Sequence, residues 1–124
     1  MSKDIIQGTL TAFFIIGLSG FAFSKIRGDF FNSIIQNVQT TPLETRLYPI
    51  LLSYLFMAFI IYYFLIFKNA TTVEAGLLGM LIFGIYNLFN YATLKKWDIV
   101  YCIFDILWGG ILFVIGYTIV KMLM

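Results

Sequence analysis

Three polar side chains that could take part in chemistry lie inside two long apolar runs near the C-terminus. Asn87 and Asn90 are three residues apart in the first run, so on a helix they would share a face, and Asp105 lies in the second run. If the two runs pair as an antiparallel hairpin about the short turn near Lys96, Asn87 and Asp105 meet at the same depth. A carboxyl group beside amides could bind a polar headgroup, a proton or a small substrate, or it could simply join two helices by hydrogen bonds.

Two aromatic side chains with polar groups extend this set. Tyr101 and Trp108 lie one helical turn on either side of Asp105, so the three residues share a face. Asp105 lies six residues into its run, roughly 10 Å deep at a rise of about 1.5 Å per residue. Because a charge at that depth is costly, we expect Asp105 to face the interior of the protein. We favour helix-joining contacts over a binding site for this polar cluster, which comprises Asp105, Asn87, Asn90, Trp108 and Tyr101.

The residue types that most enzymes rely on are scarce in this sequence. It contains no histidine, which removes imidazole metal ligands and histidine-based acid–base chemistry. The single cysteine, Cys102, cannot form an internal disulfide. A lone carboxyl group without a second acid at its depth is too little for a defined reaction. We therefore expect no enzymatic activity, no catalytic residues, no metal and no cofactor.

Composition places the chain in a membrane. Hydrophobic residues make up 61% of it and charged residues 11%, and the mean hydropathy is +0.95. Soluble domains are closer to half apolar and a quarter charged. Four apolar runs are long enough to cross a bilayer, and backbone groups in lipid must bond within a helix. The sequence predicts an all-α, multi-pass integral membrane four-helix bundle in one domain, residues 1–124, with spans at about 5–23, 47–67, 73–94 and 99–120.

The connection between the first two spans has a pattern of its own. Between Asp29 and Gln39, apolar residues recur at helical spacing and polar residues fill the opposite face. This pattern predicts an amphipathic helix lying in the membrane interface. It could pack over the mouth of the bundle or bind a partner, and the sequence does not separate the two. Its apolar residues are Phe30, Phe31, Ile34, Ile35 and Val38.

The basic residues lie near the ends of the predicted spans rather than along one face. With a net charge of +2, this distribution gives no signal for nucleic-acid binding. The first and third connections together carry more basic residues than the opposite side, which favours an orientation with both termini outside the cell. The first group is Lys25, Arg27, Arg46, Lys95 and Lys96, and the second is Lys3, Lys68 and Lys121.

Residues 83–109 resemble an uncharacterised family of small bacterial membrane proteins, known as domain of unknown function 2177. The family pattern runs Tyr-Asp-x-Thr-Asn-x-Ala-Thr-Leu, a basic residue, Trp, and later Asp-x-x-Trp-Gly. Asn87 stands where the family has an acid, and Phe89 stands where it has threonine. The resemblance covers about residues 80–115 and implies four helices with a shared polar cluster, without an established activity. The matching residues are Tyr86, Asn90, Ala92, Thr93, Leu94, Trp97, Asp105, Trp108 and Gly109.

These observations favour a structural role over a catalytic one. We expect a non-enzymatic structural or accessory subunit of a larger membrane assembly, such as a respiratory or photosynthetic complex or the inner membrane of a virion. Its partners would be membrane lipids and other protein subunits, with no nucleic acid. The alternative is a small lipid-binding or proton-coupled transport protein whose intramembrane site is centred on Asp105.

Overall fold

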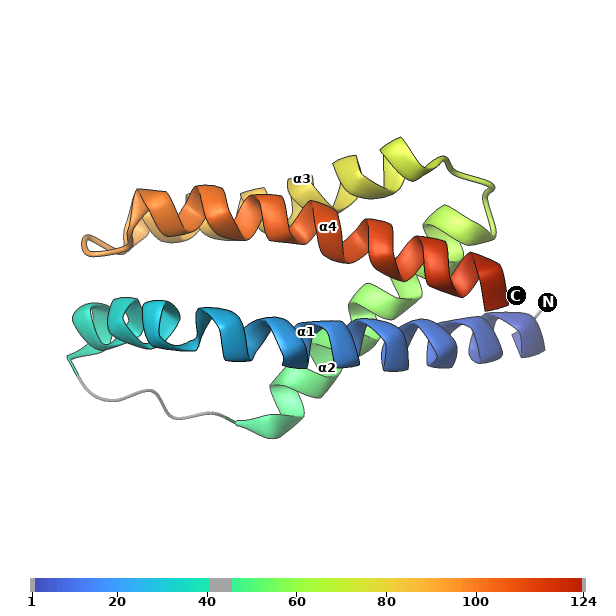
Figure 1. Cartoon of the computed structure of the whole chain (residues 1–124), viewed down its shortest axis with the longest axis horizontal. Coiled ribbons are helices and arrows are strands. Elements are labelled where there is room, and N and C mark those ends of the chain that lie inside the picture. The colour runs from blue at the N-terminus through green and yellow to red at the C-terminus, as the bar shows by residue number, and fades with distance from the viewer. Residues whose placement is uncertain (1, 41–45, 124) are drawn as a thin grey trace.

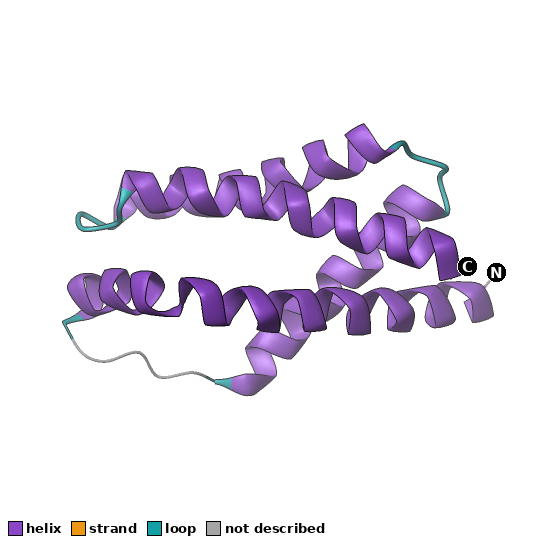
Figure 2. Ribbon diagram, viewed as in Figure 1, coloured by secondary structure: helices purple, strands orange, loops and turns teal. Residues whose placement is uncertain are grey.

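The computed structural model describes residues 2–40 and 46–123, and in these residues it contains helices and turns without a strand (Figures 1 and 2). Four helical rods are long and apolar enough to cross a membrane, which confirms the predicted all-α membrane fold. The candidate spans are Lys3–Ile26, Leu47–Ile66, Thr72–Thr93 and Ile99–Leu123. The helices are α1 (Ser2–Gln39), α2 (Leu47–Phe59), the π-helix η1 (Ile60–Ile66), α3 (Thr72–Thr93) and α4 (Ile99–Leu123).

The hairpin of α3 and α4 is the most closely packed part of the molecule. A Cβ atom on Gly79 would overlap the carbonyl oxygen of Gly109, so the two helix backbones touch where both residues lack a side chain. The turn between the helices is closed by a hydrogen bond from the Trp97 N–H to the Leu94 carbonyl oxygen, at 3.0 Å. Asp98 then caps α4, because its Oδ1 accepts the N–H groups of Val100 (2.7 Å) and Tyr101 (3.1 Å).

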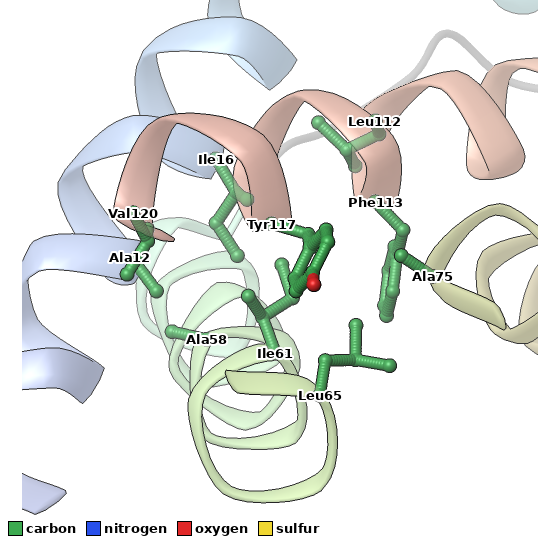
Figure 3. Close-up of a cluster of buried hydrophobic side chains, with 10 residues drawn as sticks. All are labelled: Ala12, Ile16, Ala58, Ile61, Leu65, Ala75, Leu112, Phe113, Tyr117 and Val120. Atoms are coloured by element: carbon green, nitrogen blue, oxygen red, sulfur yellow. The ribbon is translucent and has the colours of Figure 1, made fainter. Parts of the chain in front are cut away.

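Helix α1 runs antiparallel along α4. Near the chain termini, Ile16 packs at Gly116, where a Cβ atom would lie 2.9 Å from the isoleucine. Ten buried side chains from α1, α2, η1, α3 and α4 form the main hydrophobic core at this end of the bundle (Figure 3). They are Ala12, Ile16, Ala58, Ile61, Leu65, Ala75, Leu112, Phe113, Tyr117 and Val120.

The second span is α-helical in its first part and π-helical in its second part. Helix α2 packs along α1 and crosses behind it in Figure 1. Within the second span, η1 rather than α2 contacts α3 and α4. The close contacts with α1 again occur at glycines, with the Tyr54 side chain over Gly20 and the Tyr62 ring over Gly8. The wide turns of η1 end in i→i−5 hydrogen bonds such as Phe67 N–H to Tyr62 O at 2.8 Å. Hydropathy gave no indication of this π-helix.

The amphipathic segment, residues 29–39, is helical, but it is the continuation of α1 rather than a separate helix. Residues 24–39 contain no proline, and Gly28 alone does not break the ladder of backbone hydrogen bonds. Ile34 is buried beside Trp97 and Tyr101, so the segment lays its apolar face on the turn between α3 and α4.

The first two spans are offset from the α3–α4 hairpin. Contacts of Phe23 with Trp108 and of Phe30 with Tyr101 place Ile26, where the apolar part of α1 ends, level with about Asp105. Helix α4 begins about six residues earlier, roughly 10 Å nearer the turn at a rise of about 1.5 Å per residue. The first turn of α2 also lies well short of the α3–α4 turn in Figure 1. Among residues 2–40 and 46–123, the part of the chain that accompanies the hairpin near that turn is the continuation of α1.

Candidate functional site

The polar cluster is centred on a buried pair between α3 and α4. The Asn87 side chain is fully buried, Asp105 is 6% exposed, and Asn87 Nδ2 donates a hydrogen bond to Asp105 Oδ2 at 2.8 Å. The same Nδ2 donates to the carbonyl oxygen of Phe83 at 2.8 Å, which fixes the amide on its own helix. The structure therefore brings Asn87 and Asp105 together at one depth. A charged or neutral carboxyl group can accept this bond, so the contact holds the hairpin together in either state.

Cys102 adds a third group that the sequence did not assign to the cluster. It is buried, and its Sγ donates to the backbone carbonyl oxygen of Asn87 at 3.5 Å. Asn90 is half-buried one helical turn away and lies outside the Asn87–Asp105 hydrogen bond. The position of Cys102 one turn before Asp105 was the only sequence signal for its role.

Trp108 and Tyr101 face α1 rather than the Asn87 side chain. The Trp108 ring stacks on Phe23 with centroids 3.9 Å apart, and the Tyr101 ring meets Phe30 edge-on at 5.4 Å. These two aromatic contacts lie one on each side of Asp105, so the turn of α1 between Phe23 and Phe30 lies opposite the carboxyl group.

The five apolar residues of the amphipathic segment cover the end of the hairpin. Ile34 is buried, whereas Phe31, Ile35 and Val38 are half-buried and Phe30 lies at the edge. Their neighbours in this second hydrophobic cluster are Trp97, Tyr101, Cys102 and Leu94. This face is thus occupied within the molecule, as expected for a segment that packs over the mouth of the bundle.

Three buried polar atoms have no hydrogen-bond partner among the described residues. They are Asn87 Oδ1, Trp97 Nε1 and Thr9 Oγ1. Asn87 Oδ1 is an unused acceptor beside Asp105, and Trp97 Nε1 is an unused donor in the turn. Such atoms are uncommon in folded proteins and suit a bound water; a ligand would offer a donor group to Asn87 Oδ1 and an acceptor group to Trp97 Nε1. The described residues contain no group of three or more His, Cys, Asp or Glu side chains that could hold a metal ion.

The depth of the site depends on which helices define the membrane boundary. Measured along α4, Asp105 lies roughly 10 Å inside the span, as the sequence predicted. Measured against α1, it lies level with Ile26, the last residue of the apolar span. The site is therefore enclosed by protein at the level where α1 changes from apolar to polar.

Comparison with known proteins places this chain in a family. No curated protein and no solved structure matches it. A family model described as predicted membrane protein (DUF2177) matches residues 5–120 and so extends the resemblance seen at residues 80–115 over nearly the whole chain. The four apolar helices agree with the membrane protein that this description names. The chain belongs to the family of predicted membrane proteins DUF2177.

Proposed function

We propose that this multi-pass membrane protein is a non-enzymatic structural or accessory subunit of a larger membrane assembly. The observation that carries the proposal is the offset of roughly 10 Å between the end of the apolar part of α1 and the start of α4 at the α3–α4 turn. A flat bilayer cannot match both pairs of helices at the end where α3 turns into α4.

If the bilayer boundary follows α3 and α4, the outer face of α1 is too polar for its surroundings. Lys25 and Asp29 are exposed on this face at levels where α4 exposes apolar side chains such as Ile103. Charged and polar groups at hydrocarbon depth are costly unless a polar surface covers them. A partner that offers hydrogen bonds to this face would remove that cost.

If the bilayer boundary follows α1 and α2, the turn end of the α3–α4 hairpin protrudes from the bilayer and exposes apolar side chains to water. Its outer surface includes Phe89 (67% exposed), Val100 (63%) and Ile103 (57%). A contiguous apolar surface in water is a typical site of protein association. Both boundaries therefore leave a surface that a partner subunit would cover better than lipid or water.

We expect this assembly to be a respiratory complex, a photosynthetic complex or the inner membrane of a virion. The closed Asn87–Asp105 pair supports this class of function, because a buried hydrogen bond joins helices without offering an open site.

One observation favours a second candidate, a small lipid-binding or proton-coupled transport protein. Asn87 Oδ1 is buried beside Asp105 and has no hydrogen-bond partner among the described residues. An unused acceptor next to a carboxyl group could receive a proton donor during transport. The substitution Asp105→Asn separates the candidates, because it should leave a structural subunit in its assembly and abolish ligand or proton dependence in a transporter.

The direct test is extraction from native membranes in a mild detergent, followed by native mass analysis. We expect the chain to travel with other proteins in fixed stoichiometry. Substitution of Ser33 by Trp on the polar face should release it, whereas Leu77→Trp on an exposed apolar face of α3 should not. Migration of the wild-type chain as a monomer or a small homo-oligomer would overturn the proposal.

A further inference from the structure

A groove lies between the end of α1 and the turn that joins α3 to α4. It has a volume of about 240 Å³, and its polar side carries Asn37, Lys95 and Lys96. Val38 and Leu94 form its apolar side, and both belong to the hydrophobic cluster beneath. The groove therefore presents cationic and amide donors next to apolar surface, which is the combination that an amphiphilic anion requires.

The charges around the groove leave it positive. Two helices end beside it, α1 at Gln39 and α3 at Thr93, and each helix end carries a partial negative charge of about half an elementary charge. The two lysines supply two full positive charges, and both are exposed. The nearest acid on the turn, Asp98, already accepts the N–H groups of Val100 and Tyr101 at the start of α4.

With a membrane boundary that follows α3 and α4, the groove also lies at the depth of lipid headgroups. Lys95 and Lys96 follow directly after the span that ends at Thr93, and α4 begins its own span at Ile99. Tyr91, near the end of α3, is exposed and is a residue type that concentrates at the membrane interface. Basic pockets between helices at this level recognise anionic headgroups.

We propose that the groove formed by Asn37, Lys95 and Lys96 binds the phosphate of an anionic membrane lipid, with the start of its acyl chains on Val38 and Leu94. The two ammonium groups and the Asn37 amide supply the donors for the phosphate oxygens. Occupation of this site would hold the end of α1 against the α3–α4 turn. The inference goes beyond the proposed assembly role and does not depend on a partner.

The experiment is a thermal unfolding titration of the purified chain in detergent. Phosphatidylglycerol should raise the Tm in a saturable way, and phosphatidylcholine with the same acyl chains should not. In the double variant Lys95→Gln/Lys96→Gln, the half-saturating concentration of phosphatidylglycerol should rise roughly tenfold or more. The matched control is Lys3→Gln/Lys68→Gln, which removes two exposed lysines from the other end of the bundle and should titrate like the wild type.

Three results would overturn the proposal. The first is the absence of a Tm shift with phosphatidylglycerol, and the second is an equal shift in the Lys95/Lys96 variant. The third is an equal shift with inorganic phosphate at the same concentration, which would assign the groove to a free anion. Circular dichroism of the double variant in detergent shows whether it is folded, and a variant with Lys96→Gln alone tests the site if it is not.

Discussion

At the scale of single residues, Asn87 links the two helices of the hairpin. Its Nδ2 reaches both Asp105 on α4 and the Phe83 carbonyl oxygen on α3. The pairing of Asn87 with Asp105 could be predicted because a short turn fixes the register of an antiparallel hairpin. The hydrogen bond of Cys102 to the Asn87 carbonyl oxygen and the unpaired Trp97 Nε1 could not be predicted, since apolar spacing does not determine which buried atoms find a partner.

The link predicts a measurable loss of stability for Asn87→Ala. Removal of the amide leaves the buried Asp105 without this donor, which should cost about 1–3 kcal/mol in the free energy of unfolding. Equilibrium unfolding in detergent checks the loss. Asn90→Ala makes the same chemical change at a half-buried residue outside the pair and should cost less than about 0.5 kcal/mol. Equal losses in the two variants would show that the hydrogen bond contributes no particular stability.

At the scale of helices, close packing occurs where glycines face a neighbour. A Cβ atom on Gly79 would overlap the backbone of Gly109, whereas one on Gly17 would meet open space. Hydropathy predicted the four spans to within a few residues, because length and apolar content determine them. It could not predict η1 or the continuity of α1, since packing against neighbours decides the helix type and whether a helix continues past Gly28.

The difference between these two glycines is testable. Gly79→Ala should lower the free energy of unfolding by about 1–3 kcal/mol, because the new methyl group forces α3 and α4 apart. Gly17→Ala makes the same change in open space and should be neutral or slightly stabilising, since alanine favours a helix by about 1 kcal/mol over glycine. Thermal unfolding of both purified variants gives the comparison. If Gly79→Ala leaves the free energy of unfolding unchanged, then α3 and α4 can move apart at this position without a loss of stability.

At the scale of the whole molecule, the apolar part of α1 ends roughly 10 Å short of the turn between the apolar helices α3 and α4. The sequence contains the signs of this offset, since the apolar run of α1 ends before Lys25 while the apolar run of α3 continues to Leu94. The relative levels of these two positions, however, depend on the register of α1 against α4. That register is set by aromatic contacts between distant parts of the chain, such as Phe23 on Trp108. The hydropathy of separate runs therefore could not reveal it.

The offset predicts how two positions at one level will react with a membrane-impermeant thiol reagent. By the register of the helices, Asp29 on α1 and Phe89 on α3 lie at about the same level as Ile103, and all three side chains are exposed. The experiment replaces Cys102 by Ser and then introduces Asp29→Cys or Phe89→Cys.

In permeabilised native membranes a partner should shield the thiol of Asp29→Cys from the reagent, and after purification this thiol should react quickly. Phe89→Cys should stay slow in reconstituted bilayers, because lipid covers α3. Fast labelling of Asp29→Cys in native membranes would mean that water, rather than a partner, covers the polar face of α1.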